Sequence, residues 1–77
     1  MDYRKEAEIY GQQFINELDE PDMYEPYTNS DGSYRYLHIY HKKSCDRMLT
    51  LRARTWRELF ETVRDAWNAH VFMKRGF

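Results

Sequence analysis

Two stretches in which side-chain character alternates, SYRYLHIYH at residues 33–41 and RMLTLRAR at residues 47–54, decide the fold class. In the first stretch, Leu37 and Ile39 lie on one face of an extended strand, while the tyrosines and His38 lie on the other. The second stretch alternates in the same way, with its leucines on one face. Because residues 42–46 between them suit a hairpin loop, we predict an antiparallel hairpin over residues 33–54.

The apolar positions also predict the register of this hairpin. If the loop is centred on Ser44, every aliphatic residue faces another aliphatic residue across the two strands. A slip by one residue would destroy that match. The predicted pairs are Ile39 with Leu49, Leu37 with Leu51, Tyr40 with Met48, His38 with Thr50, Tyr36 with Arg52, and Tyr34 with Arg54.

A helix is predicted on each side of the hairpin. Residues 2–18 carry an apolar stripe at spacings of three and four, made of Tyr3, Ala7, Tyr10, Phe14 and Leu18. Residues 56–74 follow Thr55 and Glu58, which have the spacing of a capping box at a helix start. Their stripe consists of Trp56, Leu59, Phe60, Val63, Trp67 and Val71.

The segment between the first helix and the hairpin, residues 19–32, is predicted to be an acidic loop. It holds two prolines and five acids, and residues 29–32 have the composition of a turn. Residues 24–28 are compatible with a short strand, which Pro26 would confine to a sheet edge. The predicted fold is therefore a small α+β single domain over residues 1–77, ordered helix, acidic loop with an edge strand, hairpin, helix.

The placement of the helices decides which face of the sheet stays free. Both helices can cover one face, or each can cover its own. We expect the first helix to bury its stripe on the tyrosine face of the hairpin, because that stripe needs an apolar partner.

Composition restricts the class of protein. A chain of 77 residues makes one domain with a small core, and 13 aromatic residues (seven Tyr, four Phe, two Trp) supply much of the area to bury. The only cysteine, Cys45, cannot form an internal disulfide. The chain has no apolar signal-like start and no run of about 20 apolar residues, so we expect a cytoplasmic protein without membrane contact.

Charge is divided along the chain. Residues 1–31 hold nine acids and two bases, a net charge of −7, whereas residues 32–77 hold ten bases and four acids, a net of +6. The two halves either neutralise each other by packing together or leave one half to meet a charged partner.

The sequence shows no residue pattern typical of a catalytic or metal-binding site. His38, His41, Cys45, Asp46 and His70 do not have the spacing of a zinc site. The three glycines are isolated, so no phosphate-binding loop is present. Cys45 beside His41 in a loop lacks a pocket and oxyanion donors. We therefore predict no enzyme activity and no cofactor.

Nucleic acid is one candidate ligand. The tyrosine face, if uncovered, would place aromatic and basic side chains together as single-strand-binding sheets do. The candidate residues are Tyr34, Tyr36, His38, Tyr40, Lys42, Lys43, Arg52 and Arg54. The order of elements is similar to that of double-stranded-RNA-binding domains, but Trp56-Arg57-Glu58-Leu59 replaces a basic cluster, so no family is assigned.

A protein partner is the preferred hypothesis. Acids of the loop would steer the chain to a basic surface, and Tyr and Met would supply contact area. The candidate residues are Glu17, Asp19, Glu20, Asp22, Met23, Tyr24, Glu25 and Tyr27. In size and character the chain is similar to small accessory proteins of phages and mobile elements. The leading hypothesis is thus an inhibitor of a larger nucleic-acid-handling protein. Single-strand binding is the alternative, and self-association of the acidic and basic halves is a third reading.

Overall fold

The computed structural model describes residues 1–76 and has an α+β fold in the order helix, three strands, helix. A short 3₁₀ turn stands between the first helix and the first strand. The elements are α1 (Tyr3–Asn16), η1 (Pro21–Met23), β1 (Tyr24–Ser30), β2 (Arg35–His41), β3 (Arg47–Ala53) and α2 (Trp56–Gly76). Neither helix is long and apolar enough to cross a membrane in this described part of the chain.

The sheet is antiparallel in the order β1-β2-β3. The edge strand suggested for residues 24–28 is present and extends to Ser30. The segment before it covers residues 17–23 and not 19–32, because α1 also ends two residues earlier than predicted, at Asn16. The predicted turn also lies later, at Asp31 and the residues after it, because residues 29 and 30 pair with β2. Pro26 is tolerated because β1 has a neighbour on one side only.

Of the six predicted pairs of the hairpin, four are present and one differs, while the sixth, Tyr34 with Arg54, lies beyond the ends of β2 and β3. Ile39 faces Leu49, and the pairs made by Leu37, His38 and Tyr36 are also as expected. Tyr40, however, faces Arg47 and not Met48, because a β-bulge inserts one extra residue beside Ile39. The bulge turns Arg47 toward the tyrosine face of the sheet.

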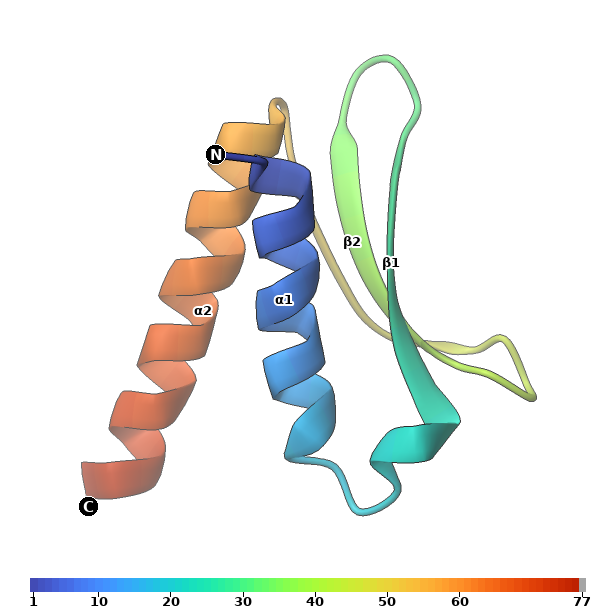
Figure 1. Ribbon diagram of the computed structural model, residues 1–77, viewed down its shortest axis with the longest axis vertical. Coiled ribbons are helices and arrows are strands. Elements are labelled where there is room, and N and C mark those ends of the chain that lie inside the picture. The colour runs from blue at the N-terminus through green and yellow to red at the C-terminus, as the bar shows by residue number, and fades with distance from the viewer. Residues whose placement is uncertain (77) are drawn as a thin grey trace.

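Both helices lie side by side on one face of the sheet (Figure 1). The expectation that α1 covers the tyrosine face is therefore wrong. The α1 stripe is instead buried against α2 and against the Leu37/Ile39 face. Tyr3 meets Phe60 with ring centroids 5.5 Å apart, and Phe14 meets Trp67 edge-on at 5.1 Å. The fully buried apolar side chains are Ala7, Ile15, Leu37, Ile39, Leu59 and Val63.

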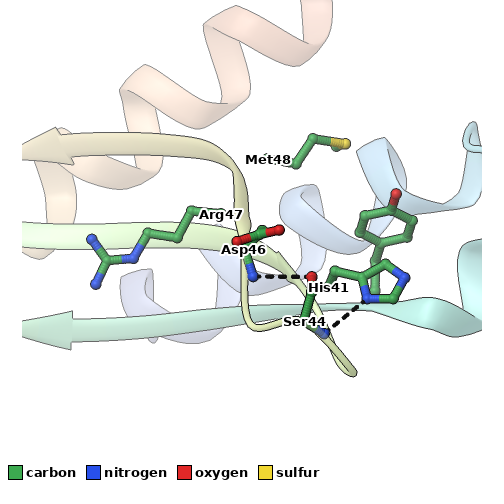
Figure 2. Close-up of a pocket in the computed structure, with 6 residues that line it drawn as sticks. His41, Ser44, Asp46, Arg47 and Met48 are labelled. Carbon is green, nitrogen blue, oxygen red and sulfur yellow. Dashed lines mark hydrogen bonds between the residues drawn. The ribbon is translucent and has the colours of Figure 1, made fainter.

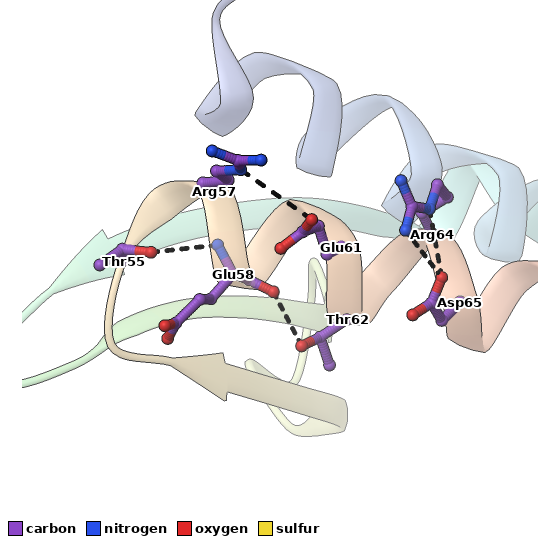
Figure 3. A network of polar contacts seen from close by, with 7 residues as sticks. All are labelled: Thr55, Arg57, Glu58, Glu61, Thr62, Arg64 and Asp65. Atoms are coloured by element: carbon purple, nitrogen blue, oxygen red, sulfur yellow. Dashed lines mark hydrogen bonds and ion pairs between the residues drawn. The ribbon is translucent and has the colours of Figure 1, made fainter.

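The start of α2 is fixed by the predicted capping box (Figure 3). The Glu58 amide donates to the Thr55 hydroxyl at 3.1 Å, and the Glu58 carboxylate accepts from the Arg54 amide at 3.3 Å. The first bond satisfies an amide that a helix start leaves without a partner, and the second ties the residue before the cap to the first turn. Further along α2, Arg57 pairs with Glu61 and Arg64 with Asp65 on its exposed surface.

A polar cluster joins the start of α1 to the sheet. Arg4 donates to the hydroxyl of buried Thr28 at 2.8 Å and to its carbonyl at 3.0 Å, and the Thr28 hydroxyl donates to Glu8 at 2.6 Å. The guanidinium groups of Arg4 and Arg35 both lie over the ring of Trp56, 4.9 and 5.7 Å from its centroid. The cluster therefore holds α1, β1, β2 and α2 together at one end of the domain.

Gly11 is where α1 comes closest to the sheet. A Cβ atom at this position would lie 3.2 Å from Pro26 and 3.3 Å from Leu37. Leu37 is fully buried, and the proline ring is rigid, so neither neighbour can move away easily. Glycine lowers the helix propensity at this position, but it allows the close approach of α1 to the sheet.

We predict that Gly11→Leu destabilises the fold by about 1–3 kcal/mol or more, because the new side chain must push α1 off the sheet. Urea unfolding followed by circular dichroism measures the change. Gln12→Leu is the matched control, since Gln12 is exposed on the same helix. Equal stabilities of the two variants would contradict the close packing described at Gly11.

Candidate functional site

The face of the sheet opposite the helices is uncovered within residues 1–76, and we call it the open face. The register places its side chains in three rows, and each row runs across β1, β2 and β3. The rows are Glu25–Tyr40–Arg47, Tyr27–His38–Thr50 and Asn29–Tyr36–Arg52. The predicted nucleic-acid set falls here, apart from Lys42 and Lys43, which lie exposed in the β2–β3 loop.

Aromatic rings on the open face contact one another. The His38 ring is nearly parallel to the rings of Tyr36 and Tyr27, with centroid distances of 5.6 and 6.3 Å. Tyr27 also meets Tyr40 edge-on at 6.2 Å. These contacts make a continuous aromatic surface across β1 and β2, in which Tyr27 remains 49% exposed.

His38 lies inside this aromatic surface and is only 5% exposed. Its Nδ1 atom is 2.9 Å from the Thr50 hydroxyl. Burial, with the positive charge of Arg47 as a second cause, lowers the pKa of His38 below its ordinary value of 6.5. His38 is therefore neutral at pH 7, and its ring faces are covered by tyrosines.

Charged groups border the aromatic surface at the end of the sheet that lies beside the β1–β2 turn. The guanidinium of Arg52 lies 4.6 Å from the centroid of Tyr34, and that of Arg54 lies 5.8 Å from it. The Asp31 carboxylate accepts bonds from two backbone amides and from the Tyr36 hydroxyl, the last at 2.7 Å. The Tyr34 amide and the Tyr36 hydroxyl are the main causes that hold the pKa of Asp31 below its ordinary range.

Charge differs between the two edges of the open face. Glu25 lies on β1, whereas Arg47 and Arg52 lie on β3. None of these three side chains forms an ion pair with another described residue. On β1, the buried amide oxygen of Asn29 has no hydrogen-bond partner among residues 1–76.

A small pocket opens where the sheet meets the β2–β3 loop (Figure 2). Arg47 and Met48 point in opposite directions there, Met48 toward the pocket and Arg47 along the sheet. The His41 ring accepts two backbone amides of the loop through Nδ1, at 3.2 and 3.3 Å. The loop is further tied to η1, because the Lys42 amide donates to the Met23 carbonyl at 2.8 Å.

The predicted protein-binding residues are divided among four places. Glu17 is paired with Lys74 and His70 of α2, and the hydrogen bond with Lys74 is the main cause that lowers its pKa. Met23 and Tyr24 are half-buried at the start of β1. Glu25 and Tyr27 belong to the open face.

The remaining three acids form what we call the acidic turn: Asp19, Glu20 and Asp22. All three are exposed, and none has an ion-pair partner among the described residues. Asp19 and Glu20 line a pocket with Leu18 and Tyr24, which supply apolar walls. The turn sits between α1 and β1 and is thus set apart from the rows of the open face.

Metal binding finds no support in the geometry. Across residues 1–76, no three His, Cys, Asp or Glu side chains gather closely enough to hold an ion. Cys45 is exposed in the β2–β3 loop, where its φ angle is +62°.

Five members of the three rows lie outside the predicted nucleic-acid list. Glu25 and Tyr27 were assigned to the protein-binding set, and Asn29, Arg47 and Thr50 were in neither list. Asn29 could have been found by continuing the alternation of Glu25 and Tyr27 for one more step. Thr50 was already placed opposite His38 by the register. Arg47 was expected beside the hairpin tip, because the alternation keeps it off the tyrosine face, and the bulge turns it to the open face.

Comparisons with known proteins find no family model, no curated protein and no solved structure that matches this chain. The function is therefore inferred from the geometry of the open face and the acidic turn alone.

The lowered pKa of His38 predicts a pH-dependent stability. In the unfolded chain His38 takes up a proton near its ordinary pKa of 6.5, whereas the folded protein resists protonation. The free energy of unfolding should therefore fall as the pH drops from about 7.5 to about 5.5. Urea midpoints at the two pH values measure this, and His38→Gln should show a smaller fall. An equal fall in both proteins would exclude His38 as its source.

Proposed function

We propose that this protein is a non-enzymatic interaction module whose acidic turn binds a basic surface of a larger protein. The observation that carries this proposal is a difference among the acids. Glu17 on one side of the turn is neutralised by α2, and Glu8, Glu61 and Asp65 are paired with arginines. The acids of the turn alone are grouped, exposed and without ion-pair partners in the described chain.

The surroundings of the acidic turn suit a basic side chain from a partner. The pocket beside it combines carboxylates with the apolar surface of Leu18 and the ring of Tyr24. A lysine or arginine can place its aliphatic stem on such a surface and its charge near the carboxylates. Pro21 and the bond from the Lys42 amide to Met23 restrict the backbone next to the turn, which lowers the entropy lost on binding.

Proteins that bind nucleic acid carry basic surfaces that contact its phosphate groups. An acidic turn bound there would compete with phosphate groups, and the module would then act as an inhibitor of that protein. Acidic groups outside the final contact would mainly raise the rate of association, since they steer the two molecules together.

The experiment first captures the partner by a photo-crosslinker at Met23, with Gln13 on exposed α1 as the control position. Association of the captured protein is then measured with a variant in which the three acids of the turn are replaced by Lys. We expect association to slow by about tenfold or more, and the wild-type rate to fall with salt.

A matched triple variant separates local steering from net charge. Replacing Glu6, Glu61 and Asp65 by Lys changes the charge of the chain equally, but at sites on the two helices. This control should slow association much less. Equal slowing by both triple variants would remove the acidic turn from the mechanism.

Binding of single-stranded nucleic acid is the second candidate, because the open face combines tyrosines with Arg47, Arg52 and Arg54. Against it stand the covered ring of His38, the carboxylates of Glu25 and Asp31, and the position of Arg52 over Tyr34. These features leave few ring faces free for bases to stack on.

A fluorescence titration with a mixed-sequence DNA single strand tests this candidate. If bases stack on the open face, binding weakens steeply with salt, and Tyr36→Ala costs about 1–3 kcal/mol of binding free energy. Phe72→Ala is the control, since it removes an exposed aromatic ring from α2. The absence of binding at low salt would exclude nucleic acid as a ligand of the open face.

A further inference from the structure

The open face is an aromatic surface whose two edges are chemically complementary to each other. Its β1 edge offers the Glu25 carboxylate, which is an acceptor. Its β3 edge offers the guanidinium groups of Arg47 and Arg52, both donors. The two edges belong to the same sheet and are separated by β2, and no ion pair joins them among the described residues of one copy.

We propose that the open face binds a second copy of this chain, with the two sheets packed face to face about a two-fold axis parallel to β2. This inference goes beyond the proposed function, because the acidic turn lies between the helix layer and β1. The dimer would then carry two acidic turns, both available to a larger partner.

Charge decides between the two symmetric ways of stacking these sheets. A two-fold axis across the strands would place β3 over β3 of the second copy, and arginines would meet arginines. An axis parallel to the strands places β1 over β3 of the second copy at both edges. Only the second arrangement brings opposite charges together. Because the interface is two-fold, each such contact occurs twice in the dimer.

The rows of the open face are kept in this arrangement, because a rotation about an axis along the strands leaves positions along the strands unchanged. Glu25 faces Arg47 of the second copy, and Asn29 faces Arg52 of the second copy. Tyr27, the most exposed tyrosine of the open face, faces Thr50 of the second copy. Tyr36, His38 and Tyr40 on β2 meet their own counterparts near the axis.

The composition of this surface also suits an interface between proteins. Tyrosine and arginine are enriched at such interfaces, and aligned sheets pack face to face with their strands within about 30° of each other. The bulge beside Ile39 is essential here, because without it Arg47 would not lie opposite Tyr40 in the same row as Glu25.

Sedimentation velocity over a concentration series, with charge-swapped variants, tests the proposal. The wild-type chain should pass from monomer to dimer as its concentration rises. Glu25→Arg and Arg47→Glu should each raise the dimer dissociation constant by about tenfold or more, since each places like charges together twice. The double variant carrying both changes should restore dimerisation, because the swapped charges attract again.

Lys5→Glu on exposed α1 is the control, and it should leave the dissociation constant unchanged. Thermal unfolding by circular dichroism confirms that each variant is folded. If either charge-reversed variant does not fold, Arg47→Gln is measured in its place. It should raise the dimer dissociation constant less than a charge reversal does, because it removes a charge without inverting it.

Three results would overturn the proposal. The first is a wild-type chain that stays monomeric at every concentration. The second is a dimer that both single reversals leave intact or that the double variant fails to restore. The third is a monomer whose open face binds a DNA single strand and loses it on Arg47→Glu. None of these results bears on the acidic turn, whose own variants keep the open face unchanged.

Discussion

The approach of α1 to the sheet at Gly11 is the constraint on which the other features depend. Because no side chain separates the helix from Pro26 and Leu37, α1 can lie beside α2 over the same face of the sheet. The two helices then bury their aromatic stripes against each other, as in the contact of Phe14 with Trp67. The tyrosine face of the sheet is left without a helix. Both candidate surfaces follow from this arrangement, since α1 must return through the acidic turn to reach β1.

The hairpin and the two helices could be predicted from the sequence because their signals are local. Alternation around Leu37 and Leu51 specifies the face and register of β2 and β3, and Thr55 with Glu58 specifies the start of α2. The full length of β1 could not be predicted in this way. Its acids and Pro26 disfavour regular structure locally, and only pairing with β2 over seven residues overrides them.

The position of α1 was wrongly predicted for a different reason. Its stripe is rich in Tyr and Phe, so an aromatic face and an aliphatic face were both chemically acceptable partners. The helix packs on the aliphatic face because the side chains of Leu37 and Ile39 have no polar atoms that need hydrogen bonds. The side chains of Tyr36 and His38 do need them, and they find hydrogen-bond partners in Asp31 and Thr50. For the candidate site, the tyrosines were visible in the sequence, but the row that joins Glu25 to Arg47 depends on a bulge.

The two tryptophans lie in one layer of the fold, so their fluorescence reports on that layer alone. Trp56 contacts the guanidinium groups of Arg4 and Arg35, and Trp67 packs on Phe14 and His70, so both indoles belong to the helix layer. The open face carries tyrosines and a histidine but no tryptophan. Tryptophan emission therefore reports whether the helices are packed. Covering the sheet should change the near-ultraviolet dichroism of Tyr27, Tyr36 and Tyr40, over a constant contribution from Tyr3 and Tyr10 of the helix layer, and leave the tryptophan emission unchanged.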